Sequence, residues 1–105
     1  MITSQHCKLK NEVVISPRRS FDYSIHQDFR DAYKDHSAPR IKFVVDLSQV
    51  KYIDSSALGM LLLLQEHAQK LGGDARLHHP TDSVAKLIKI ANFDTLFHIT
   101  YTSST

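Results

Sequence analysis

The sequence predicts a small α/β domain built on a largely parallel sheet, and three observations support this fold class. Runs rich in β-branched and aromatic residues alternate with segments whose apolar residues recur every three to four positions. No repeat or low-complexity linker interrupts this alternation. The 105 residues, 42% of them hydrophobic, suffice for one core but not for two domains of ordinary size. We expect a single domain over residues 1–101, with a mixed, mostly parallel sheet of about four to five strands packed against three or more helices, and a frayed tail over 102–105.

Two short strands and a helix are expected before residue 40. Residues 7–9 and 13–15 flank the polar segment 10–12, an arrangement typical of two strands joined by a tight turn. A helix is expected to begin at Asp22, whose side chain can cap its first turn. The apolar residues that recur on one side of this helix are Ile25, Phe29, Ala32 and Tyr33.

Strands and helices alternate over the rest of the chain. Residues 41–47 are typical of a strand buried on both faces. A helix is expected over 56–71, because Gly72 and Gly73 follow it and glycine favours the left-handed conformation at a helix end. The remaining expected elements are a strand over 74–79, ended by Pro80, a helix from Thr81 and Asp82 to about Asn92 with Val84, Leu87, Ile88 and Ala91 on one face, and a strand over 96–101.

Charge and composition argue against several classes of function. The 13 Lys and Arg residues and 11 Asp and Glu residues are scattered, and the net charge is only +2, so no nucleic acid partner is expected. A single cysteine, Cys7, favours a reducing compartment. No signal peptide is readable, and the densest apolar run, 57–64, is too short for a membrane span. We therefore expect a cytoplasmic protein with no direct membrane insertion and no cofactor.

The most informative segment joins the expected strand over 41–47 to the following helix through Asp54, Ser55 and Ser56. Any of these three side chains can cap the helix by accepting a hydrogen bond from a free backbone N–H, worth about 0.5–2 kcal/mol. Alternatively, the partial positive charge of the helix N-terminus can hold a phosphate added to one of the serines. Such a phosphate would add about −1.5 to −2 charges beside Asp54 and act as a switch on whatever binds there.

A helical wheel separates two faces of the helix over 56–71. The residues that cluster on the face expected to meet the core are Ala57, Leu61, Leu64, Ala68 and Leu71. The residues on the far side, in the same stripe as Ser55, are Leu58, Gly59, Leu62 and Glu66. Two leucines and a glycine aligned with a modifiable serine suggest a docking surface, although neighbouring loops that cover the leucines would explain them equally well.

These motifs resemble the STAS domain of bacterial anti-sigma factor antagonists. The residues that carry the resemblance are Asp46-Leu47-Ser48, Val50, Asp54-Ser55-Ser56-Ala57-Leu58-Gly59, Leu71-Gly72-Gly73, Val84, Leu87, Ile88 and Phe93. They occur in order and with compatible spacing over residues 11–100, which is far more specific than a single short motif.

The resemblance implies a partner-switching function without enzymatic activity. Ser55, or alternatively Ser56, would be phosphorylated by an anti-sigma factor that is itself a serine kinase, and a PP2C-type phosphatase would reverse this. The unmodified, monomeric protein would bind the anti-sigma factor and free a sigma factor. Asp22 corresponds to an acidic residue near the phosphorylated serine, or is simply a cap. The expected partner-binding residues are Asp22, Asp54, Ser55, Ser56, Leu58, Gly59, Leu62 and Glu66.

Two residues depart from the family pattern. Ala57 and Arg19 stand where the family usually has glycine, Arg19 three residues before Asp22. Ala57 is a small helix former and should be tolerated, whereas Arg19 alters the loop beside Ser55 and is either solvated or available to pair with a phosphate.

Three alternative functions were compared with the switch. STAS domains also resemble accessory subunits of lipid-transport ABC assemblies, which bind an ATPase without phosphorylation. A serine hydrolase using Ser55 and Asp54 is disfavoured, because the chain has no Gly-x-Ser-x-Gly motif. A metal site is not expected either, because the adjacent His78 and His79 point to opposite faces of a strand and the other histidines are scattered.

Overall fold

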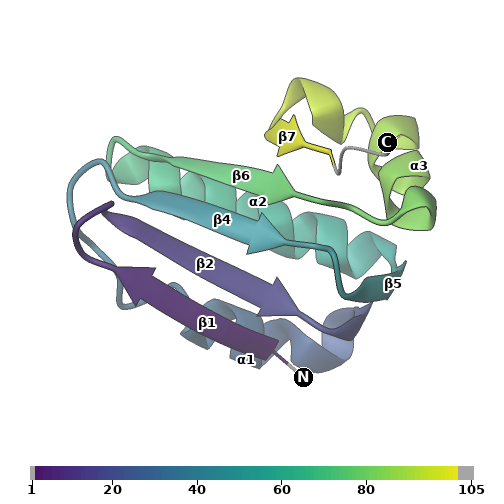
Figure 1. Ribbon diagram of the computed structural model, residues 1–105, viewed down its shortest axis with the longest axis horizontal. Coiled ribbons are helices and arrows are strands. Elements are labelled where there is room, and N and C mark those ends of the chain that lie inside the picture. The colour runs from purple at the N-terminus through teal and green to yellow at the C-terminus, as the bar shows by residue number, and fades with distance from the viewer. Residues whose placement is uncertain (1, 102–105) are drawn as a thin grey trace.

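The computed structural model describes residues 2–101, and its centre is a five-stranded mixed sheet (Figure 1). In spatial order the strands are β1 (Ile2–Cys7), β2 (Glu12–Pro17), β4 (Lys42–Asp46), β6 (Asp74–His78) and β7 (His98–Thr100). Strand β1 is antiparallel to β2, and the other neighbours are parallel. Two further strands, β3 (Arg19–Phe21) and β5 (Val50–Ile53), form a separate parallel pair. The expected mixed, mostly parallel sheet is confirmed.

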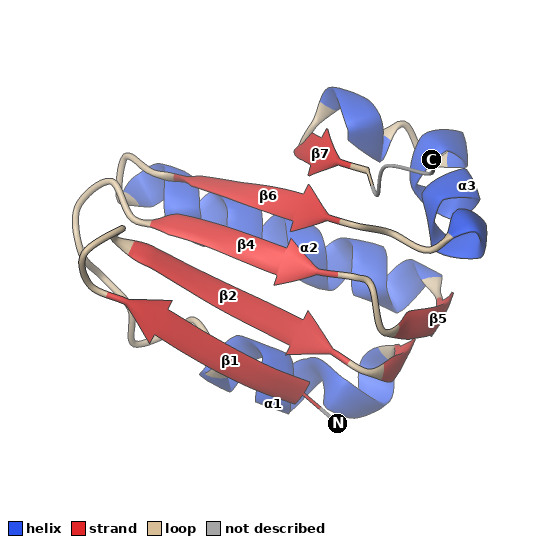
Figure 2. Cartoon of the chain, viewed as in Figure 1, coloured by secondary structure: helices blue, strands red, loops and turns tan. Residues whose placement is uncertain are grey.

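Two of the main helices lie behind this sheet, and the third lies beside it, beyond the ends of the strands (Figure 2). They are α1 (His26–Asp31), α2 (Ser55–Lys70) and α3 (Asp82–Ile90), with short 3-10 helices η1 (Tyr23–Ile25) and η2 (Phe93–Thr95). Helix α1 packs on α2, α2 packs on β6, and α3 packs on β5 beyond the edge of the main sheet. No helix within residues 2–101 is long and apolar enough to cross a membrane.

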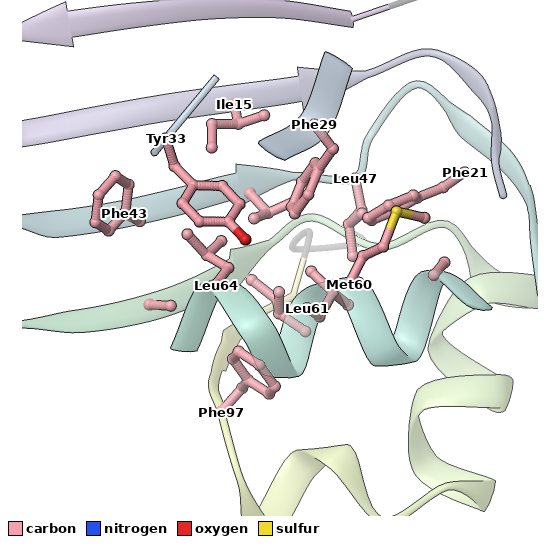
Figure 3. Close-up of a cluster of buried hydrophobic side chains, with 14 of the residues drawn as sticks. Ile15, Phe21, Phe29, Tyr33, Phe43, Leu47, Met60, Leu61, Leu64 and Phe97 are labelled. Carbon is pink, nitrogen blue, oxygen red and sulfur yellow. The ribbon is translucent and has the colours of Figure 1, made fainter. Parts of the chain in front are cut away.

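Alternating side chains build a core between the sheet and α2 (Figure 3). The inward-facing residues of the central strands, among them Ile15, Phe43 and Leu77, are fully buried. Each buried side chain of this size contributes about 1.5–3 kcal/mol. The four residues of α2 expected to face the core up to Ala68 are indeed buried, Leu71 is half-buried, and Met60 joins them.

The outer face of the sheet is polar. Glu12 on β2 pairs with Lys42 on β4, which pairs with Asp74 on β6, so the three side chains form a row across neighbouring strands. Val44, also on this face, is only 3% exposed, but Lys42 and Asp46 on either side of it are half-buried, so β4 is fully buried on its inner face alone. Since helices cover only the inner face, the protein presents its solvent-facing helix surface on the opposite side of the molecule from this polar row.

Several predicted boundaries were wrong, and the errors fall where structure depends on contacts distant in sequence. The predicted strand over 7–9 was misplaced, because residues 8–11 form the turn and Leu9 is fully exposed. The helix predicted from Asp22 is divided into η1 and α1, and the strand predicted over 96–101 is limited to β7. Strands β3 and β5 were not predicted, since each is stabilised by the other. The tail expected over 102–105 lies outside the described residues, and the domain limits remain predictions.

Gly73 is required by the close approach of two backbone segments. A Cβ atom at this position would lie 1.7 Å from the carbonyl oxygen of Ile41, which is far inside van der Waals contact. Backbone atoms cannot rotate away as a flexible side chain can, so Gly73→Ala is expected to lower the free energy of unfolding by at least about 2 kcal/mol. Urea denaturation followed by circular dichroism measures this change.

Gly59 provides the matched control for that substitution. No atom lies within 4 Å of a Cβ built there, so Gly59→Ala is expected to stabilise the protein by about 0.5–1 kcal/mol through improved helix propensity. Equal losses of stability in Gly59→Ala and Gly73→Ala would contradict the assigned role of the close approach at Ile41.

Aromatic and imidazole rings cluster around His36. The His36 ring meets the His6 ring at a centroid distance of 4.8 Å, and its backbone carbonyl contacts Nε2 of His67 at 2.9 Å. Burial, followed by the nearby His6 and His67, lowers the pKa of His36 below its ordinary value, while Asp35 opposes the shift. Burial lowers the pKa of His78 as well.

The shift at His36 predicts weaker folding in mild acid. Below about pH 6.5 the unfolded chain takes up a proton that the folded imidazole resists, so the free energy of unfolding should fall between pH 7.5 and pH 5.5. His36→Gln is expected to reduce this slope without abolishing it, because His78 contributes in the same direction. Urea titrations at several pH values measure the slope, and an unchanged slope in the variant would contradict the assignment.

Candidate functional site

The pairing of β3 with β5 places two acidic residues at the same end of two neighbouring strands. Phe21 is in register with Ile53, and the backbone N–H of Asp54 donates to the carbonyl of Phe21 at 3.4 Å. Asp22 and Asp54 therefore leave the two strands side by side, and each caps the helix that follows. The capping function expected of Asp22 is found at η1, while its proximity to Ser55 stays a prediction.

Asp54 and Ser56 form a capping network at the N-terminus of α2. The Oδ1 atom of Asp54 accepts hydrogen bonds from the backbone N–H of Ala57 at 3.1 Å and from the hydroxyl of Ser56 at 2.6 Å. The hydrogen bond from Ser56 is the main cause that lowers the pKa of the Asp54 carboxyl. The carboxylate is therefore ionised at neutral pH, and the Ser56 hydroxyl is already engaged.

Ser55 differs from its neighbour in both exposure and hydrogen bonding. It is the first residue of α2 and is exposed, whereas Ser56 is half-buried. Within residues 2–101, the hydroxyl of Ser55 makes no hydrogen bond. The structure thus presents Ser55 as the accessible hydroxyl of the pair.

The electrostatic surroundings of Ser55 are mixed. Helix α2 has 16 residues, and its N-terminus carries a partial positive charge with free N–H groups that favour an anion. Asp22 and Asp54 add negative charge at the same end. A phosphate on Ser55 would be held by the helix N-terminus and repelled by the carboxylates, so it would alter the surface potential more than the fold.

An apolar groove between α2 and α3 adjoins Ser55. It has a volume of about 260 Å³, and Ser55 and Leu58 line it together with Leu87 and Ile90 of α3. Leu87 is 42% exposed and Ile90 is 77% exposed, while Leu58 is half-buried against the core. Leu62, one turn further along the stripe, is 40% exposed. We call this surface, made of Ser55, Leu58, Leu62, Leu87 and Ile90, the α2–α3 surface.

Sequence reasoning missed the contribution of α3 to this surface. Leu87 was assigned to the buried face of its helix because it follows Val84 at helical spacing, but it is partly exposed. Ile90 is outside that pattern, and an apolar residue outside the core stripe was the one available signal. Leu58 lines the same groove as Leu87 and Ile90 because α3 packs on β5, and the sequence pattern does not show this tertiary contact.

Two residues expected in the site lie elsewhere on α2. Glu66 is eleven positions from Ser55, about 16 Å along the helix, and its Oε1 lies 3.6 Å from Nζ of Lys70. Gly59 and Glu66 line cavities on the flank of α2 that faces α1, not on the α2–α3 surface. The stripe predicted from the helical wheel is thus divided between the two flanks.

The two departures from the family pattern have clear local structures. Arg19 has a φ angle of 64°, in the left-handed region that glycine adopts without strain, and its N–H donates to the carbonyl of Gln49 at 2.7 Å. Its side chain lines a cavity with Ser24 and Ile25, and Ser55 does not contribute to that cavity. Ala57 is fully buried under the start of α2.

The remaining candidates for chemistry are metal ligands and the single cysteine. Within residues 2–101, no group of three His, Cys, Asp or Glu side chains is placed to hold a metal ion. Cys7 is an exposed free thiol on the edge strand β1.

The capping network predicts different effects for neighbouring substitutions. Asp54→Ala is expected to cause the largest loss of stability, because it removes the acceptor of both hydrogen bonds. Ser56→Ala should cause a smaller loss, and Ser55→Ala should change the free energy of unfolding by no more than about 0.5 kcal/mol. Thermal denaturation of the three variants tests this order, and a loss in Ser55→Ala equal to that in Asp54→Ala would contradict it.

Comparisons with known proteins identify the family to which the chain belongs. The family model described as "Mlab, STAS domain" matches residues 8–100. A STAS-domain containing protein of Pseudomonas aeruginosa (strain UCBPP-PA14) is 44% identical over 88 residues, which cover 84% of this chain and 87% of the relative.

Solved structures share the fold at low sequence identity. An anti-sigma-factor antagonist (STAS) domain protein from Planctomyces limnophilus superimposes with a TM-score of 0.82 at 17% identity, covering 97% of this chain and 91% of the other. The anti-sigma factor antagonist SpoIIAA in its unphosphorylated form gives a TM-score of 0.80 at 14% identity, covering 99% and 90%. With the match over residues 8–100, these findings show that the chain belongs to the STAS domain family and has the fold of SpoIIAA-like anti-sigma factor antagonists.

Proposed function

We propose that this chain is an anti-sigma factor antagonist whose binding to its partner is controlled by phosphorylation of Ser55. The observation that carries the proposal is the contrast between two adjacent hydroxyls. Ser56 is committed to the cap of α2, whereas Ser55 is exposed, makes no hydrogen bond within residues 2–101 and borders an apolar groove. A modifiable group at the rim of an apolar surface is well placed to control what binds there.

The unmodified protein would bind through the α2–α3 surface. Exposed Leu62, Leu87 and Ile90 supply apolar contact area, and Asp22 and Asp54 supply fixed negative charge at its edge. The partner is an anti-sigma factor with serine kinase activity, and its capture by this chain would release a sigma factor. An apolar centre with a polar rim is the usual anatomy of a protein interface.

Phosphorylation would weaken this complex through charge and desolvation. A phosphate on Ser55 adds about −1.5 to −2 charges next to two carboxylates, so the site could be buried only against a strongly basic partner surface. The phosphate would leave the fold intact, because the N-terminus of α2 tolerates an anion. A PP2C-type phosphatase would restore the binding form, and the chain itself would act as a monomer and perform no catalysis.

Substitutions at Ser55 are expected to separate the two states of the switch. Ser55→Ala should bind the partner constitutively, and Ser55→Asp should bind it at least about tenfold more weakly, because a carboxylate would be buried beside Asp54. Affinity capture from native lysate with wild-type and Ser55→Asp baits, read by mass spectrometry, should recover a serine kinase with the wild type alone. Calorimetric titration of the recovered partner then gives the affinities.

Ser56→Ala is the control for the position of the switch. It should retain binding, since the Ser56 hydroxyl is turned toward Asp54. Equal partner affinity for Ser55→Ala and Ser55→Asp would contradict the switch, and phosphate mapped to Ser56 after incubation with the kinase would contradict the choice of residue.

A second candidate function is that of an accessory subunit in a lipid-transport ABC assembly. The observation favouring it is that the family model matching residues 8–100 is described as "Mlab, STAS domain" and not as an antagonist family. In that case an ABC ATPase should be captured equally by the wild-type and Ser55→Asp baits, and Ser55 would have no regulatory function.

A further inference from the structure

A second groove runs along the opposite flank of α2, between α2 and α1. It consists of two adjoining cavities of about 310 Å³ and 340 Å³. Arg30, Tyr33 and Leu63 line both cavities, which places the two next to each other along α2. On α2 the groove extends from Ser56 to Lys70, about 21 Å at the helical rise.

The end of this groove near the N-terminus of α2 is apolar. Its floor includes the buried Phe29 and Met60. Gly59 has no side chain, so this part of the groove is open to a bound molecule. Its rim carries Tyr23, 64% exposed, and Leu63, 58% exposed. The Tyr23 ring stacks on the His26 ring with a centroid distance of 4.1 Å and an interplanar angle of 10°. This stacking fixes the orientation of the Tyr23 ring at the side of the groove.

The other end of the groove is basic. Three cationic side chains, Arg30, Lys34 and Lys70, line it with a single carboxylate, Glu66. Lys70 pairs with Glu66 at 3.6 Å and Lys34 pairs with Asp31 at 2.9 Å, but exposed pairs of this kind are weak and exchange readily for other partners. Arg30 makes no salt bridge within residues 2–101.

Tyr33 joins the two ends at the floor of the groove. Its side chain is 6% exposed and belongs to the same core cluster as Leu64 of α2, both of which Figure 3 labels. Burial raises the pKa of its hydroxyl, which therefore remains a neutral donor, and this hydroxyl makes no hydrogen bond within residues 2–101. A polar group of a ligand bound along the groove could accept a hydrogen bond from the Tyr33 hydroxyl.

We propose that this groove binds an amphipathic helix of a partner protein, with apolar residues over Gly59 and carboxylates over Arg30 and Lys70. An apolar groove between two helices is a common binding site for a third, amphipathic helix. The basic end of the groove favours acidic residues in that helix by charge complementarity. About 21 Å accommodates a helix of roughly fourteen residues.

This binding would be independent of the switch at Ser55. Residues 55, 58 and 62 lie on the flank of α2 toward α3, whereas residues 59, 63 and 70 lie on the flank toward α1. The protein could then hold a second partner while the α2–α3 surface is occupied or phosphorylated. The inference goes beyond the proposed function and does not require it.

The test is an NMR titration of the full, isotopically labelled chain with a synthetic helical peptide of fourteen residues. The peptide carries leucines on one face of its first two turns and glutamates in its last two turns, and a second peptide has lysine in place of every glutamate. Saturable shifts at the amides of Arg30, Gly59 and Leu63, with Ser55 and Ile90 unmoved, are the expected result with the acidic peptide. The lysine peptide should bind at least about tenfold more weakly.

Adjacent leucines supply a matched pair of variants. Leu63→Ser removes the apolar rim of the groove and should weaken peptide binding at least about tenfold, as should Arg30→Glu. Leu62→Ser lies on the other flank and should not change the affinity, nor should Ser55→Asp. The proposal is overturned if no saturable binding occurs at about millimolar peptide, if the shifts map to Ser55 and Ile90, or if Leu62→Ser and Leu63→Ser are equivalent.

Discussion

The hydrogen-bonded pairing of two short strands, β3 and β5, determines the geometry of the candidate site. The strands have only three and four residues, yet their register brings Phe21 opposite Ile53 and the two following aspartates to one end. Phe21 and Ile53 are buried, so the pairing is tied to the main core and not to local propensity alone. The start of α2 is fixed in direction by this small sheet, and the exposure of Ser55 depends on that direction.

Helix α2 combines three kinds of surface around its axis. One face is buried against the sheet, one flank meets α3, and the other flank meets α1. Stability comes mainly from the buried face, where Leu61 and Leu64 are fully buried. The two flanks are therefore free to carry exposed apolar residues such as Leu62 and Leu63, which folding alone does not require.

The sequence was sufficient to predict elements whose signal is local and periodic. The strand around Val45, the end of α2 at the two glycines and the buried face around Leu61 were confirmed. Asp22 and Asp54 follow paired strands, but the proximity of Asp22 to Ser55 and the functions of both residues remain predictions. What the sequence could not provide were features that arise when distant segments meet. The exposure of Leu87 is one such feature, because it depends on how α3 packs at the end of the sheet.

The polar row on the outer face of the sheet has a consequence for strand alignment. Acidic, basic and acidic side chains follow one another across β2, β4 and β6, through Glu12, Lys42 and Asp74. If β4 slipped by one residue, Phe43 would turn toward water and Lys42 toward the apolar core, since side chains alternate along a strand. A slip by two residues that brought Val44 opposite Glu12 would keep the faces correct but would remove the charge match. The outer face thereby discriminates between the two alignments that hydrophobic burial alone leaves equivalent.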